Sequence, residues 1–264
     1  MFPVLISKNY IQTKTQLHHL LKILGGFSKA HSGELPGWAH LSVRVTENSF
    51  ITAPLDRAED IVLAMDFSDM NMKVYNSSGN EVWKHDFGKA PLDQVYQFFD
   101  DTITNLGHTH KVDKPESSNQ KLDEAVAKDL HKAYWGIHKA FADVRKRLHT
   151  EPDNIMLWPH HFDLAFNWYS GKGEGEEAEM IYHGFSSGDE TDPIPYFALY
   201  RYPWDENFKP SVEKPAQFHQ KNWKGIFLDY NDFLEAAKDD QHNYLVDFIV
   251  SSHDELTRST LALT

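Results

Sequence analysis

The chain contains short segments in which apolar and polar residues alternate, and tight turns join them. This pattern is compatible with few folds. Five such segments succeed one another in the first third of the chain, at residues 38–45, 50–54, 61–67, 70–75 and 81–87. Turn-forming residues separate them, for example Ser68-Asp69 and Asn76–Asn80. Parallel strands need a crossover of a dozen or more residues, so connections this short make neighbouring strands antiparallel. The sequence therefore predicts an antiparallel meander.

Segments in which apolar residues recur at helical spacing flank these strands and occur again later in the chain. We predict helices at residues 9–25, 91–106, 122–148 and 244–256. The first is expected to end at Gly25-Gly26 and the second at Gly107. Further strands are predicted at 178–185, 196–202 and 225–229. This order predicts an α+β fold in which helices pack on one face of one or more antiparallel sheets.

A possible internal repeat follows from the order of these elements. The polar segment 110–120 is a predicted linker between two similar helix–strands–helix halves, residues 1–109 and 121–264, within a single domain, 1–264. Trp38-x-His40 and Trp158-x-His160 each open the first strand of a half. His40 lies on the polar face of its predicted strand, whereas in the later copy His161, and not His160, lies on that face. A bulge at Pro159 would account for this shift by one position.

The candidate site is centred on the aromatic stretch Leu157–Lys172, which we interpret as a central strand. Side chains alternate between the faces of a strand. One face would carry Phe162, Leu164, Phe166 and Trp168, and the other His161, Asp163, Ala165, Asn167 and Tyr169. An imidazole and a carboxylate two residues apart can move a proton, hold a metal or bind a polar ligand. In the simpler interpretation, Asp163 only orients His161, because buried polar groups usually satisfy one another.

If the two half-sheets join, their polar faces share one concavity. That concavity would display His40, Ser42, Arg44, His161, Asp163 and Asn167, and the candidate ligand-binding set adds Tyr169, Glu179 and Tyr200.

Three functions are compatible with this site. The first is a small-molecule-binding protein, in which Arg44 favours an anionic ligand and Tyr169 or Tyr200 stacks or donates. The second is a hydrolase, either with His161 as general base oriented by Asp163 or with a metal bound by His40, His161, Asp163 and Glu179. The third is a structural or interaction protein. The sequence has no H-E-x-x-H, G-x-S-x-G or P-loop motif, and it leaves the identity of any cofactor open.

The amino-acid composition limits the kinds of binding partner that we expect. The net charge of −13 repels the phosphates of nucleic acids and anionic membranes, so we expect neither as a partner. The chain has no cysteine, which excludes disulfides and thiolate chemistry and fits a cytoplasmic protein. The N-terminus lacks a signal-peptide pattern, and no apolar run reaches transmembrane length.

Several motifs resemble a mainly bacterial domain-of-unknown-function family, number five-nine-nine-six. They are Thr15–His18, Trp38-x-His40-x-Ser42-Val43, Met65–Phe67, Phe162–Ala165 with Ser170–Lys172, and Tyr196–Tyr200 before Tyr202-Pro203. The chain departs from the family pattern at Ala178-Glu179, where a His-Glu pair is expected, and at 184–188, which lacks Trp-Pro after Gly-Phe. If the histidine of that pair is a metal ligand in the family, its absence here weakens a metal role. The resemblance implies one domain and supplies no activity.

Overall fold

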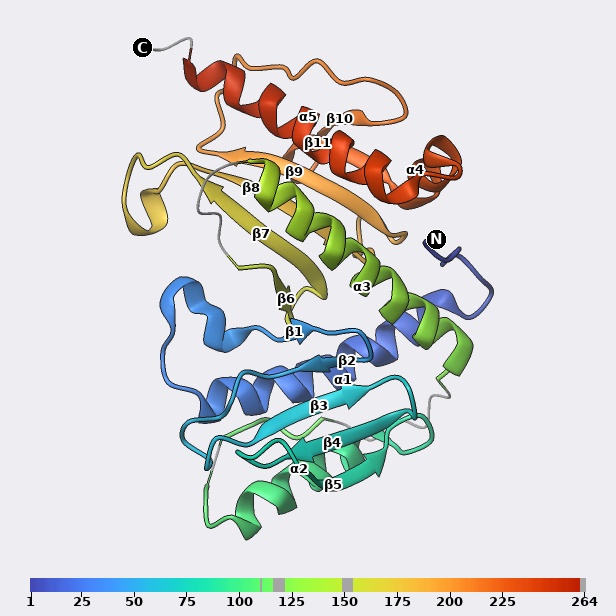
Figure 1. Ribbon diagram of the computed structural model, residues 1–264, viewed down its shortest axis with the longest axis vertical. Helices are drawn as coiled ribbons and strands as arrows, with labels where there is room; N and C mark the ends of the chain where they lie inside the picture. The colour runs from blue at the N-terminus through green and yellow to red at the C-terminus, as the bar shows by residue number, and fades with distance from the viewer. Residues whose placement is uncertain (110, 116–121, 149–153, 262–264) are drawn as a thin grey trace. The chain divides into compact units, whose positions relative to one another are not determined.

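A computed structural model describes residues 1–109, 111–115, 122–148 and 154–261 (Figure 1). The described residues form two compact units. The N-terminal unit comprises Leu5–Trp135 and Met156–Phe162, and the C-terminal unit comprises Met1–Val4, Gly136–Ile155 and Asp163–Thr264. Each unit contains an antiparallel sheet together with helices, so the predicted α+β class is confirmed.

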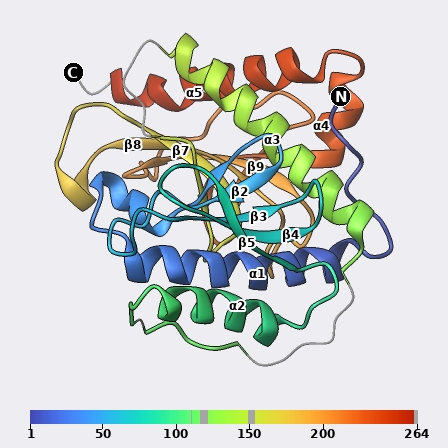
Figure 2. The same cartoon turned by 60° about the horizontal axis from the view of Figure 1, so that its bottom comes forward.

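The sheet of the N-terminal unit is the predicted meander. Its strands lie in the order β1-β2-β3-β4-β5, and every neighbouring pair is antiparallel. The strands are β1 (Arg44–Val45), β2 (Ser49–Ile51), β3 (Val62–Asp66), β4 (Asn71–Tyr75) and β5 (Glu81–Asp86). Helices α1 (Tyr10–His31) and α2 (Leu92–Asn105) run along the same side of this sheet (Figure 2). Buried apolar side chains such as Phe50, Leu63 and Met65 occupy one set of alternating positions.

The unit is completed by three further elements. They are the 3-10 segment η1 (Pro36–Leu41), the short strand β6 (Met156–Trp158) and the first half of α3 (Glu124–Arg147). Val43 pairs with Leu157 in an isolated antiparallel bridge.

The sheet of the C-terminal unit has a different strand order, β10-β11-β9-β8-β7. Its strands are β7 (Asp163–Tyr169), β8 (Met180–Ser186), β9 (Tyr196–Tyr202), β10 (Gln217–Gln220) and β11 (Lys224–Asp229), and η2 (Gly175–Glu177) precedes β8. Helices α4 (Tyr230–Ala237) and α5 (Gln241–Leu261) contact β8, β9 and β11. The sequence did not predict β10 or α4.

Two predicted strands prove to be interrupted. The segment predicted as a strand at 38–45 is η1 followed by the two-residue β1, because Gly37 and Trp38 adopt left-handed conformations with φ of 63° and 59°. The proposed central strand at 157–172 is β6 and β7 separated by a turn. In that turn the Trp158 carbonyl accepts hydrogen bonds from the amides of His161 and Phe162, and Phe162 has a φ of 57°.

Helix α1 continues past its predicted end. It runs through Gly25-Gly26 to His31. A Cβ atom at Gly25 would lie 2.5 Å from the Pro159 side chain, so the glycine permits close packing instead of ending the helix. Gly136 acts similarly inside α3, since a Cβ there would lie 2.7 Å from the ring of Phe2.

The repeat remains a prediction. Residue 110 and residues 116–120 of the proposed linker lie outside the described residues. The two units interleave along the chain, so their ranges coincide with neither 1–109 nor 121–264.

Candidate functional site

Side chains along β7 point to alternate faces of the sheet, starting with Asp163. Leu164 and Phe166 are buried on the face that packs against the helices, as predicted, while Asp163, Asn167 and Tyr169 occupy the other face. The register places Asn167 opposite Tyr182, and Tyr182 opposite Tyr200. We call this side of the sheet the aromatic face. Its members are Asp163, Asn167, Tyr169, Tyr182, Tyr196, Tyr200, Tyr202, Trp223 and Phe227.

A carboxylate and two stacked tyrosines form the polar part of the aromatic face. The Tyr182 hydroxyl donates a hydrogen bond to Asp163 Oδ2 over 2.5 Å. The rings of Tyr182 and Tyr200 stack with their centroids 4.6 Å apart and an angle of 16° between their planes. No residue that the structure describes bonds to the Tyr200 hydroxyl or to the buried Oδ1 of Asn167. The site therefore contains polar atoms whose hydrogen-bonding capacity the described residues leave unused.

The rest of the aromatic face is a wall of rings. Tyr196 stacks on Phe227, with centroids 5.0 Å apart, and Trp223 lies 6.0 Å from Tyr200. His219 of β10 stacks on Trp223 at 4.1 Å. Tyr196, Phe227 and His219 are buried within the protein, so the half-buried rings of Tyr200 and Trp223 are the ones of this group that a flat ligand could contact.

Two glycines allow these rings to lie close to the sheet. A Cβ atom on Gly184 would come within 3.0 Å of the Tyr182 ring. One on Gly225 would collide with the Leu199 carbonyl and crowd the side chains of Tyr200 and Trp223. A larger residue at either position would displace the tyrosine pair.

Burial and the Asp163 charge keep both tyrosines protonated. Burial raises the pKa of Tyr182 well above its usual range, and the Asp163 carboxylate adds to the rise. Burial and then Asp163 raise the pKa of Tyr200 to about 12. Both hydroxyls are therefore hydrogen-bond donors at neutral pH, and a second negative charge at this position is unfavourable.

The other predicted site residues of the C-terminal unit divide between the two faces. Tyr169 and Tyr200 share the aromatic face with Asp163 and Asn167. Glu179 does not join them, because its carboxylate lies 3.8 Å from the guanidinium of Arg201, a buried residue. Arg201 pairs in register with Ile181, whose side chain is buried on the opposite face.

Four predicted site residues belong to the N-terminal unit. His40 is buried in η1, where its Nδ1 accepts a hydrogen bond from the Leu35 amide over 3.2 Å. The Ser42 hydroxyl donates to the Ala39 carbonyl at 2.8 Å and so closes that turn. Arg44 is exposed on β1. His161 is exposed in the turn before β7 instead of on the strand, and its ring lies 4.2 Å from that of His160.

A neighbouring histidine, His18 of α1, has a structural role. Its Nε2 lies 3.0 Å from the Pro159 carbonyl and 3.2 Å from the His160 carbonyl. Both partners can only accept, so Nε2 carries the hydrogen and donates. This bond fixes the turn that separates β6 from β7.

Metal ligation finds no geometric support in the described part of the chain. There, no three acidic or histidine side chains are grouped so that they could hold a metal ion. The alternative in which His40, His161, Asp163 and Glu179 bind a metal stays a prediction.

Comparison with known proteins places the chain in a family. Residues 2–260 match the model of a group described as "Family of unknown function (DUF5996)". The chain belongs to this family. The resemblance inferred from its motifs is thus confirmed, and in this family member the F-D-L-A motif places Asp163 at the first residue of β7. No curated protein and no solved structure matches the chain. Among the helices of the described residues, none has the length and apolar character needed to cross a bilayer.

Proposed function

We propose that the C-terminal unit binds a small neutral compound with a hydroxyl-bearing ring, of the size of a monosaccharide or nucleoside, on its aromatic face. One observation carries the proposal. The carboxylate of Asp163 is fixed by Tyr182 beside a stacked tyrosine pair, next to polar atoms that no described residue uses. Binding sites typically combine aromatic walls with a few fixed polar groups in this way.

The chemistry of the face determines the ligand class. Ligand hydroxyls can donate to the Asp163 carboxylate and to Asn167 Oδ1, and they can accept from the Tyr200 hydroxyl. The rings of Tyr200 and Trp223 offer surfaces for stacking. The negative charge of Asp163 disfavours anions. The anionic preference inferred from Arg44 has no support in this unit, because Arg44 belongs to the other one.

The two alternatives stay predictions. In the hydrolase alternative, Asp163 orients His161, but Oδ2 of Asp163 already accepts a hydrogen bond from Tyr182. A purely structural sheet face would be indifferent to ligands.

A ligand panel tests the proposal. Monosaccharides, nucleosides and the corresponding phosphates are screened by thermal shift, and hits are titrated by isothermal calorimetry. We expect a neutral ring compound to raise the melting temperature and its phosphate to bind more weakly. Tyr200→Phe should weaken binding by about two- to tenfold, the effect of losing one neutral hydrogen bond.

Tyr202→Phe is the matched control, because Tyr202 is an exposed tyrosine at the end of the same strand and is not one of the residues that carry the proposal. It should bind like the wild type. The proposal is wrong if no neutral ring compound binds, or if Tyr200→Phe and Tyr202→Phe have equal effects.

A further inference from the structure

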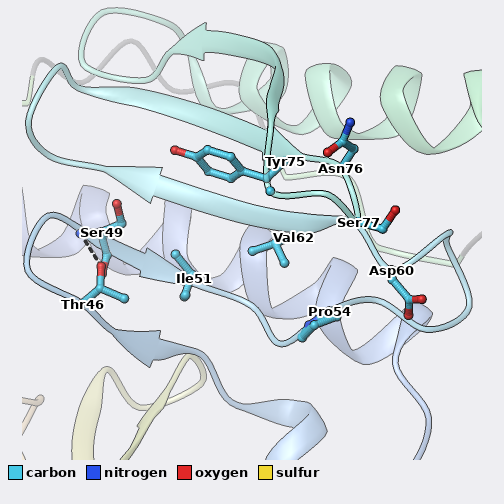
Figure 3. Close-up of a pocket in the computed structure, with 10 residues that line it drawn as sticks. Thr46, Ser49, Ile51, Pro54, Asp60, Val62, Tyr75, Asn76 and Ser77 are labelled. Atoms are coloured by element: carbon cyan, nitrogen blue, oxygen red, sulfur yellow. Dashed lines mark hydrogen bonds between the residues drawn. The ribbon is translucent and has the colours of Figure 1, made fainter.

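The N-terminal unit has a hollow on the side of its sheet that faces away from the buried core residues Phe50, Leu63 and Met65 (Figure 3). Its volume is about 580 Å³, within the size range of small-molecule sites. The lining comes from β2, β3, β4 and the adjoining loops, and consists of Thr46, Ser49, Ile51, Pro54, Asp60, Val62, Tyr75, Asn76, Ser77 and Gly79.

The floor of the hollow is apolar and its rim is polar. Ile51 and Val62 extend from neighbouring strands toward its middle, with Pro54 at one side (Figure 3). Tyr75 pairs in register with Val62, so its side chain lies next to that of Val62 on the same face, above it in the view of Figure 3. The rim carries hydroxyl, amide and carboxylate groups. An occupant would therefore have an apolar body and a polar end.

Asp60 gives the hollow its charge. It is the one lining residue whose side chain is charged at neutral pH, and its carboxylate is exposed at the end of the hollow next to Pro54 and Ser77 (Figure 3). Arg44, the cross-strand neighbour of Ile51, does not line the hollow.

A second group of acids adjoins the hollow along the same face. Lys73 contacts three carboxylates, with Nζ 3.0 Å from Asp66, 3.0 Å from Asp69 and 3.6 Å from Glu81. Lys84 also lies 3.9 Å from Glu81, so two positive charges meet three negative ones and the group stays net negative. Asp66 pairs in register with Ser49, and Glu81 with Tyr75, so this group borders two lining residues.

The field of these acids reaches the tyrosine. Burial raises the pKa of Tyr75, and the charges of Asp66, Glu81 and Asp69 add to the rise against the opposing effect of Lys73. A negative potential beside an aromatic ring attracts cations, both directly and through the ring face.

We propose that the hollow binds a small arylalkylamine, with its ammonium group at Asp60 and its ring along Ile51, Val62 and Tyr75. This site is separate from the aromatic face, and its ligand is a cation instead of a neutral compound.

Three probes with the same apolar body test the charge preference. They are 2-phenylethylamine, 2-phenylethanol and phenylacetate, each titrated into the full-length ¹⁵N-labelled protein and followed by amide chemical shifts. We expect the amine to bind at least about threefold more tightly than the alcohol, the effect of one solvent-exposed ion pair, and phenylacetate to bind most weakly. The largest shifts should fall in residues 46–79.

Two variants separate charge from shape. Asp60→Asn should remove the preference for the amine over the alcohol and leave alcohol binding unchanged, while Val62→Phe should fill the hollow and weaken both. Glu59→Gln is the matched control, because Glu59 is an exposed neighbour with a similar left-handed backbone and does not line the hollow. Equal binding of amine and carboxylate, or an Asp60→Asn variant that keeps the preference, would overturn the proposal.

Discussion

At the scale of single residues, two lysines on neighbouring strands differ sharply in their surroundings. Lys73 and Lys84 are paired in register, yet the side chain of Lys73 is 9% exposed and that of Lys84 is 58% exposed. Burial alone would raise the pKa of Asp66, but hydrogen bonds from Ser68 and Lys73 outweigh it and lower that pKa. Asp66 is thus a buried carboxylate that depends on its partners to stay charged.

We expect Lys73→Met to destabilise the protein by about 3–5 kcal/mol, because removal of one partner leaves a buried charge uncompensated. Lys84→Met removes a lysine 3.9 Å from Glu81 in solvent and should cost about 0–1 kcal/mol. Urea unfolding of both variants measures the difference. Adding Asp66→Asn to Lys73→Met should recover part of the loss. Similar losses for the two lysine variants would contradict this assignment.

At the scale of elements, α1 shows why a glycine in a helix can be required. Replacing an interior helix glycine by alanine usually stabilises the helix by about 1 kcal/mol. At Gly25 the added Cβ would meet Pro159 at 2.5 Å, and overpacking costs about 1–3 kcal/mol. We therefore expect Gly25→Ala to destabilise the wild type in urea unfolding, and to be neutral or stabilising in a Pro159→Ala background. A stabilising Gly25→Ala in the wild type would show that the close approach is not required.

The sequence predicted the elements better than their interruptions. Alternation and turn residues located β3, β4, β5 and β9 to within about a residue, because both signals are local. The failures at Trp38 and Phe162 have one cause: each adopts a left-handed conformation at a non-glycine residue, which depends on tertiary contacts. For the turn before Phe162, one such contact is the hydrogen bond from His18 to the Pro159 carbonyl.

The same reasoning explains how much of the site could be predicted. Asp163, Asn167 and Tyr169 share a face because they share a strand, and Tyr200, which was predicted from an aromatic strand, lies on the same face. Tyr182 and Trp223 were missed, since their approach depends on strand register and on Gly184 and Gly225. The combination of glycine and tyrosine in Tyr182–Gly184 was the available signal.

At the scale of the whole molecule, both units contain buried histidines held uncharged. In the N-terminal unit, burial lowers the pKa of the half-buried His18 and of the buried His131 from 6.5 to about 4. In the C-terminal unit, His183 Nε2 and His253 Nδ1 lie 3.1 Å apart. Burial lowers the pKa of His253 to about 4. Burial also lowers the pKa of His183 well below its usual value, and the proximity of His253 lowers the pKa of His183 further.

The sign of the resulting pH dependence follows from proton binding. These histidines have folded-state pKa values below their unfolded value of 6.5, so between about pH 6.5 and 4 the unfolded chain binds more protons. Stability is therefore fully present above pH 6.5 and is lost as the pH falls toward 4. A fully buried group shifted this far contributes about 3 kcal/mol. Loss from carboxylates with lowered pKa, such as Asp66, follows at still lower pH.

Urea unfolding between pH 7.5 and 4.5 measures this loss directly. His253→Leu removes one titrating group, so the variant should lose about 1–3 kcal/mol less than the wild type over that range. Leu256→Ala, a truncation of a buried residue on the same helix, should destabilise the protein at every pH and leave the slope unchanged. A stability that stays flat down to pH 4.5, or equal slopes for wild type and His253→Leu, would show that the buried histidines do not govern acid unfolding.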